Sequence, residues 1–230
     1  MAPALVRAGY FVQSYDLAGQ YESADAGPSP RSGHWDYELF FDDMLAFIRD
    51  GGGTPGAPVH VLGYSFAGVI AQLVTNRHPE LVRSLTLLTS PPMTGQVFRG
   101  VRFVGWLSRL VTARVCAKLM LWGITSNVNG VTPNRGAFVQ ARMQVTKRAS
   151  VDDIIALMRR TPDVTAGVAA SGVPALVATG DGDLWPVRTY RQYAARLGAE
   201  LAVYRTGHSP CETTPNQLVY DMLALFGRAS

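Results

Sequence analysis

The sequence is poor in cysteine. Its 230 residues include two, Cys116 and Cys211, and neither belongs to a CxxC pair or to the Cys/His spacing that holds zinc. Two isolated cysteines predict no disulfide framework, so a reduced, cytoplasmic setting is the simpler expectation. Nothing in the pattern predicts a metal or an organic cofactor.

Long hydrophobic runs are also missing. The N-terminal stretch MAPALVRAGYFVQSYDLAGQ reaches polar residues too early to form the apolar core of a signal peptide. The most apolar internal run, VCAKLMLWGI at 115–124, contains Lys118 and is too short to cross a bilayer. We therefore expect a soluble protein without a membrane partner.

Charge is sparse and nearly balanced. Lys and Arg number 21 against 17 Asp and Glu, a formal net charge of +4, and no dense basic block that could follow a phosphate backbone is present. A nucleic-acid partner is therefore not expected. Hydrophobic residues make up 47% of the chain, which suits a globular protein with a substantial core. The oligomeric state stays open.

Strand-like and helix-like runs alternate along most of the chain. Short β-branched and apolar runs predict strands, and apolar residues at helical spacing predict the helices between them. The expected strands are 11–16, 59–62, 84–89, 174–179 and 199–204; the expected helices are 37–48, one that ends before Pro79, 187–197 and 216–226. This alternation predicts an α/β fold, a mostly parallel sheet with helices on both faces.

The alternation is interrupted between residues 94 and 172. Residues 98–122 have apolar side chains at helical spacing, and Ser150 with Asp153 forms a capping-box pattern that predicts a helix start at Ser150. We expect a single domain, 1–230, in which 94–172 is a helical lid inserted over an edge of the sheet.

The sharpest chemical signal is VHVLGYSFAGVIAQ, residues 59–72, which runs from a strand through a small-residue turn into an apolar segment. A tight strand-to-helix turn projects a serine hydroxyl away from the backbone and aims an early helical N–H at a substrate oxygen. Gly63, Ala67 and Gly68 supply the small neighbours that such a turn needs. Ser65 is thus a candidate nucleophile, although an ordinary Gly/Ser turn would give the same pattern.

A nucleophilic serine needs a base and a group that orients the base. His208 lies in a loop after the last expected strand and is the candidate base. Asp181 and Asp183 follow another expected strand, and either could orient the histidine or cap the next helix. The other histidines fit a polar loop, a strand interior and a helix end, in the order His34, His60 and His78.

The order Ser65…Asp183…His208 is that of the α/β-hydrolase superfamily, and the whole chain resembles a lidded member of it. The stretches RAGYFVQSYDLAGQYES, RHPELVRSLTLLTSPP, GDGDLWPV and GHSPCETTPNQL resemble the family's strand-and-turn, pre-lid, acid-loop and histidine-loop motifs. The departures from the family pattern are Ala67 in the second glycine position of G-x-S-x-G, Gln20 and Tyr21 where a small pair is usual, and Pro186 one place early. The resemblance implies Asp183 as the triad acid and the Phe66 N–H as an oxyanion donor.

The resemblance also implies a missing part. In the family, a strand ending in His-Gly precedes the helix that RAGY closes, and its loop supplies a second oxyanion N–H. This sequence starts, at Met1, within the corresponding helix. We therefore expect an N-terminally incomplete α/β-hydrolase domain, with two neighbouring strands left unpaired and weak activity for want of the second donor.

The function that the resemblance implies is that of a serine hydrolase, which cleaves an ester or similar small acyl substrate through an acyl-enzyme. A serine nucleophile disfavours the haloalkane dehalogenase and epoxide hydrolase branches, which carry aspartate at that position. C–C bond hydrolysis, cofactor-free haloperoxidation, aminopeptidase activity and non-catalytic ligand binding on the same fold remain alternatives. Four aromatic residues are candidate substrate contacts, although helical spacing also fits plain core for those in the lid: Tyr64, Trp106, Trp122 and Trp185.

Overall fold

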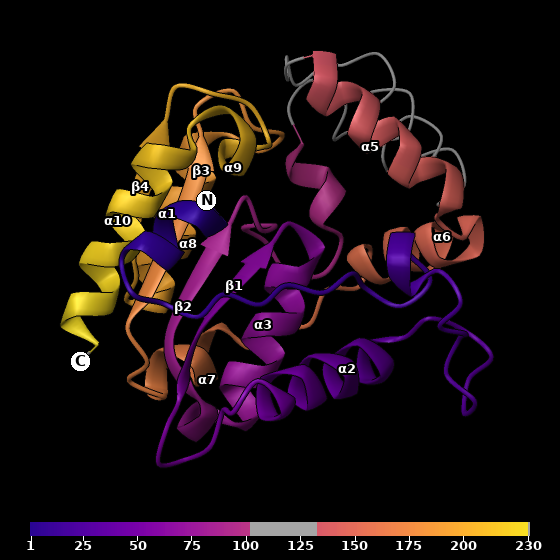
Figure 1. Cartoon of the computed structure of the whole chain (residues 1–230), viewed down its shortest axis with the longest axis horizontal. Coiled ribbons are helices and arrows are strands. Elements are labelled where there is room, and N and C mark those ends of the chain that lie inside the picture. The colour runs from indigo at the N-terminus through magenta and orange to yellow at the C-terminus, as the bar shows by residue number, and fades with distance from the viewer. Residues whose placement is uncertain (102–132, 230) are drawn as a thin grey trace.

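Among the described residues, four parallel strands form a sheet at the centre of the protein (Figure 1). The computed structural model describes residues 1–101 and 133–229. The strands are β1 (Val59–Tyr64), β2 (Val82–Leu88), β3 (Ala175–Gly180) and β4 (Glu200–Tyr204), paired in the order β1-β2-β3-β4. Every pairing is parallel, so the carboxyl ends of all four strands lie at one edge of the sheet.

Helices cover both faces of the sheet. One face carries α2 (Tyr37–Asp50), α3 (Phe66–Arg77), α7 (Thr165–Ala170) and α8 (Val187–Leu197), and the other carries α1 (Ala2–Arg7) and α10 (Pro215–Arg228). Leu87 packs in the apolar cluster of the first face, whereas its neighbour Leu88 packs in the cluster beneath α10. This alternation is the period of two that a strand covered on both faces requires.

Most of the expected alternation is confirmed. The expected helix 187–197 coincides with α8, which ends at Gly198, a residue whose φ of 65° lies in the left-handed region. The expected strands 59–62, 84–89, 174–179 and 199–204 and the helices 37–48 and 216–226 each fall on an element of the structure, within two residues at either end.

The expected strand at 11–16 is wrong. Residues 10–17 have no regular secondary structure, and β1 pairs with β2 and with no other strand among the described residues. A strand exists through hydrogen bonds to a neighbour, and this segment has none. Phe11, the first of its apolar residues, is 83% exposed, so strand-forming residue types alone did not produce a buried strand.

A helical block is inserted between β2 and β3. Its described elements are η3 (Val97–Gly100), α5 (Pro133–Val145), α6 (Arg148–Met158) and α7, and Figure 1 shows α5 beyond the end of the sheet toward which the strands point. The expected helix start at Ser150 is wrong, because α6 begins at Arg148 and the Ser150 hydroxyl donates inward to the Ala18 carbonyl oxygen at 2.9 Å. Most of the expected helix 98–122 lies outside the described residues.

The remaining described elements are short: η1 (Tyr21–Ser23), η2 (Pro79–Leu81) and α9 (Pro210–Thr213). None of the described helices combines the length and the hydropathy that crossing a membrane requires.

Candidate active site

Ser65 occupies the sharp turn between β1 and α3. Its backbone has φ 53° and ψ −122°, a conformation that costs a residue with a side chain about 1–3 kcal/mol. The Ser65 N–H donates to the Leu88 carbonyl oxygen at 2.9 Å, and the Ser65 carbonyl oxygen accepts from the Gly68 N–H at 3.0 Å. These two bonds hold the turn closed at the carboxyl end of the sheet.

Two glycines allow the strand and the helix to approach each other here. A Cβ on Gly63 would contact the Gly68 Cα, and a Cβ on Gly68 would contact the side chain of Ser90. The close approach therefore depends on Gly63 and Gly68, whereas Ala67 carries a Cβ without preventing it. This accounts for a turn that carries alanine in the second glycine position of the G-x-S-x-G pattern.

His208 bridges Ser65 and Asp183. Its Nε2 lies 3.1 Å from the Ser65 Oγ, and its Nδ1 lies 2.6 Å from the Asp183 Oδ1. The Asp183 side chain is fully buried and that of His208 is 16% exposed. Asp181 lies elsewhere, where its Oδ1 accepts from the Thr206 N–H at 3.2 Å. Of the two candidate acids, Asp183 is thus the one in contact with the histidine.

Sequence reasoning missed the residues that hold this arrangement. Thr89, at the end of β2, donates from its Oγ1 to the His208 carbonyl oxygen at 3.1 Å, and its positive φ of 44° is unusual for threonine. Thr179 and Tyr190 both donate to the Asp183 Oδ2. The available signals, a polar residue at the end of a buried strand and a tyrosine within a helix, occur in many proteins and point to no site by themselves.

Tyr64 and Trp185 flank the histidine. The Tyr64 ring lies 5.6 Å from the His208 ring between centroids, and its hydroxyl oxygen is 3.1 Å from the Ser209 Oγ. Tyr64 is 36% exposed, and the protein atoms packed around its hydroxyl raise the pKa of Tyr64 by desolvation. Trp185 is fully buried, with its indole N–H donating to the Val97 carbonyl oxygen at 2.9 Å. Its ring lies 6.4 Å from the His208 ring between centroids, and its expected substrate contact stays a prediction.

Of the three other expected site residues, the structure describes Phe66. Phe66 is the first residue of α3, so its backbone N–H has no acceptor within the helix, and its role as an oxyanion donor stays a prediction. Its side chain packs beneath the turn, against Phe40 at 5.4 Å between ring centroids. Trp106 and Trp122 lie outside the described residues.

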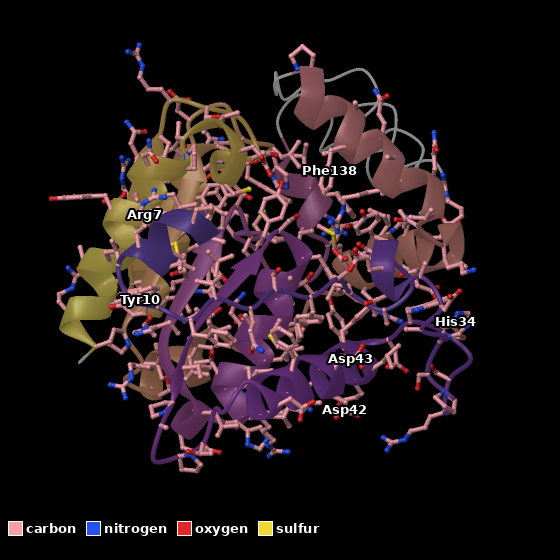
Figure 2. The ribbon with its side chains drawn as sticks, viewed as in Figure 1. Arg7, Tyr10, His34, Asp42, Asp43 and Phe138 are labelled. Carbon is pink, nitrogen blue, oxygen red and sulfur yellow. The ribbon has the colours of Figure 1, made fainter. Side chains whose placement is uncertain are left out.

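The remaining histidines take no part in the site. His60 lies on the α10 side of the sheet, where its Nδ1 is 2.8 Å from the Ser84 Oγ. Burial, with a smaller contribution from Arg83, lowers the pKa of His60 to about 4. His34 lies at the periphery of the molecule (Figure 2). Within 1–101 and 133–229, no three His, Cys, Asp or Glu side chains are grouped so as to hold a metal ion.

Comparison with protein families agrees with the geometry. The family model described as serine aminopeptidase, S33, matches residues 1–207. The chain belongs to this family of α/β-hydrolases. The family match identifies the protein as a hydrolase. The parallel sheet and the helices inserted between β2 and β3 agree with the α/β-hydrolase fold.

Solved structures share the fold of the hydrolase. A hydrolase from Pseudomonas aeruginosa PA01 aligns with a TM-score of 0.72 and 21% identity, over 98% of this chain and 82% of that one. A structure from a study of carboxylesterases of the thaumarchaeon Nitrososphaera gargenis aligns with a TM-score of 0.73 and 17% identity, over 99% and 84% of the two chains. At these identities the likeness shows the fold alone.

One curated relative matches a part of the hydrolase. The bifunctional epoxide hydrolase 2 of Rattus norvegicus is 32% identical over 92 residues, which are 40% of this chain. The match spans 15% of the rat protein's length, so the activity of that protein does not carry over to this one.

Proposed function

We propose that the hydrolase cleaves an ester or a similar small acyl substrate, with Ser65 as nucleophile, His208 as base and Asp183 as the residue that orients the base. The observation that carries this proposal is the pair of contacts made by His208, 3.1 Å to the Ser65 Oγ and 2.6 Å to the Asp183 Oδ1. An alcohol is a poor nucleophile at neutral pH, so a hydrolytic serine needs a base within hydrogen-bonding distance. A proton on Nδ1, shared with Asp183, leaves Nε2 free to accept the serine proton.

Acylation begins when the Ser65 Oγ attacks the acyl carbon and its proton moves to the His208 Nε2. The carbonyl π electrons move to oxygen, and the Phe66 N–H stabilises the resulting oxyanion. The carbonyl then re-forms, the bond to the leaving group breaks, and the leaving group takes the proton from His208. Water repeats these steps on the acyl-enzyme, which releases the acid and restores the Ser65 hydroxyl.

The identity of the nucleophile and the comparisons with known proteins restrict the class of substrate that we propose. Ser65 stands where the epoxide hydrolase branch of the superfamily carries aspartate, so the local likeness to the rat protein does not favour epoxide opening. The family description favours peptides and the carboxylesterase likeness favours esters, and both react through the same acyl-enzyme. We also assign Tyr64 to substrate contact and the inserted block at 94–172 to the selection of the substrate.

A fluorophosphonate probe tests the nucleophile. The wild-type protein should be labelled and Ser65→Ala should not, because the probe reacts with an activated serine hydroxyl. Ser209→Ala is the matched control, since it removes another hydroxyl beside the same histidine, and it should still be labelled. A wild-type protein that stays unlabelled from about pH 6 to pH 9, a range in which histidine normally loses its charge, would favour a non-catalytic ligand-binding protein instead.

Paired chromogenic substrates then separate ester from peptide cleavage. We expect p-nitrophenyl butyrate to be hydrolysed faster than an aminoacyl p-nitroanilide, and Ser65→Ala to lower kcat by about 10⁴-fold or more. Turnover that survives Ser65→Ala would rule out the proposed mechanism. A preference for the anilide would keep the mechanism and assign the hydrolase to peptide substrates.

A further inference from the structure

The Asp183 carboxylate is surrounded by hydrogen-bond partners. Its Oδ1 accepts from the Leu184 N–H at 2.6 Å and contacts the His208 Nδ1 at 2.6 Å. Its Oδ2 accepts from the Thr179 hydroxyl at 3.1 Å and from the Tyr190 hydroxyl. An ionised carboxylate offers about four lone-pair sites, and in this fully buried side chain all of them are used.

The partners divide between the two oxygens in a way that fixes the orientation of the carboxylate. Thr179 comes from β3 and Tyr190 from α8, so two separate elements hold the Oδ2 from two directions. Without them the carboxylate could rotate about its Cβ–Cγ bond, and the Oδ1 would no longer point steadily at the histidine. Buried groups with every hydrogen bond satisfied are rigid for this reason.

Tyr190 is suited to be a permanent donor. Its side chain is fully buried, and burial, together with the neighbouring Asp183 charge, raises the pKa of Tyr190 well above its usual value. The phenol therefore keeps its proton wherever the protein is folded, and that proton has the Asp183 Oδ2 as its acceptor.

We propose that Tyr190, assisted by Thr179, is a positioning residue for hydrolysis: its hydroxyl anchors the Asp183 Oδ2 so that the Oδ1 holds the His208 imidazole in line with Ser65. This inference rests on the proposed function, because it names the residue that holds Asp183, the proposed triad acid, in position. Tyr190 touches no reacting atom and acts through Asp183 and His208.

Tyr190→Phe tests the inference because it removes the hydroxyl and keeps the ring. We expect kcat/KM for p-nitrophenyl butyrate to fall by about tenfold, mostly in kcat, which is the scale of one lost hydrogen bond to a charged group. The acid limb of the kcat/KM profile should move to higher pH, because a carboxylate with fewer donors holds the imidazolium more strongly. Thr179→Val should act in the same direction, and Thr179→Ser, which keeps the hydroxyl, should behave like the wild type.

Tyr193→Phe is the matched control. Tyr193 lies one turn further along α8, is equally buried, and donates its hydroxyl to the Gln72 Oε1 instead. The Tyr193→Phe protein should be less stable than the wild type but keep the wild-type kcat/KM and pH profile. Wild-type rate and pH profile in Tyr190→Phe, or equal loss of rate in both variants, would overturn the inference. Fluorophosphonate labelling of the wild type is read first: its absence defeats the proposed function, whereas a labelled wild type with an unaffected Tyr190→Phe defeats this inference alone.

Discussion

At the scale of the residue, the turn that presents Ser65 depends on Gly63 having no side chain. A Cβ there would meet backbone atoms of Gly68 and Ala67, and backbone cannot yield without separating α3 from β1. We expect Gly63→Ala to lower the free energy of unfolding by about 1–3 kcal/mol and to slow fluorophosphonate labelling of Ser65. Urea denaturation and the labelling rate measure the two effects.

Two further glycine variants serve as comparisons for the stability of Gly63→Ala. A Cβ on Gly68 would meet both the Oγ and the Cβ of Ser90; rotation of the serine moves only its Oγ, so Gly68→Ala should also lose stability. A Cβ on Gly56 would have no atom within 4 Å, and Gly56→Ala should stay within about 0.5 kcal/mol of the wild type. If Gly63→Ala were as stable as Gly56→Ala, the close approach at the turn would be refuted.

At the scale of the element, α8 carries Tyr190 and ends at a single left-handed residue. Gly198 has φ 65° and ψ 24°, and no atom lies within 4 Å of the position its Cβ would take. Backbone strain is therefore the main cost of a side chain there, and Gly198→Ala should lower the free energy of unfolding by about 1–2 kcal/mol. Gly198→Asn should lose less, because asparagine tolerates this conformation better. Equal urea midpoints for the glycine and alanine proteins would contradict this explanation of the helix end.

Elements with local end signals could be predicted from the sequence, and those that need a distant partner could not. The end of α8 followed from Gly198, which acts on its own backbone. The segment 11–16 has strand-forming residues but no neighbouring strand among the described residues, and nothing local reveals a missing partner. The start of α6 was misplaced at Ser150 because that serine bonds to Ala18, far away in the sequence.

The same distinction applies to the site. The order of motifs was enough to select Ser65 and His208, which the structure brings to 3.1 Å. The choice of Asp183 over Asp181 needed the family pattern, since both follow one strand in nearly the same loop. Tyr190 could not have been selected, because its role depends on how α8 packs over the end of β3, and a buried tyrosine within a helix looks like ordinary core.

At the scale of the whole molecule, parallel pairing gathers the candidate site. Ser65, Thr89, Asp183 and His208 each follow a different strand, and the four strands end at the same edge of the sheet. Two apolar clusters, one on each face, hold those strands in register. The geometry around His208 therefore depends on packing at both faces, including the face covered by α10, which contributes none of these residues.

His60 lies on the face of the sheet covered by α10 and makes the stability of that face depend on pH. Its ring stacks on Phe226 of α10 with 3.8 Å between centroids and meets the edge of Tyr10, which Figure 2 shows beside α10. Its Nδ1 lies 2.8 Å from the buried Ser84 Oγ. A charge on this ring would be poorly solvated and close to Arg83, so the pKa of His60 falls from 6.5 to about 4.

The stability of the hydrolase should consequently weaken on mild acidification. As the pH falls from about 6.5 to about 4, the unfolded chain binds a proton at His60 that the folded chain does not, so the free energy of unfolding decreases over that interval and the contribution of His60 levels off below it. His60→Gln removes this titration, while the carboxylates titrate alike in both proteins and cancel in the comparison. Urea denaturation at closely spaced pH values should show the wild type losing stability relative to His60→Gln between those limits, and a difference that stays constant throughout would contradict the coupling.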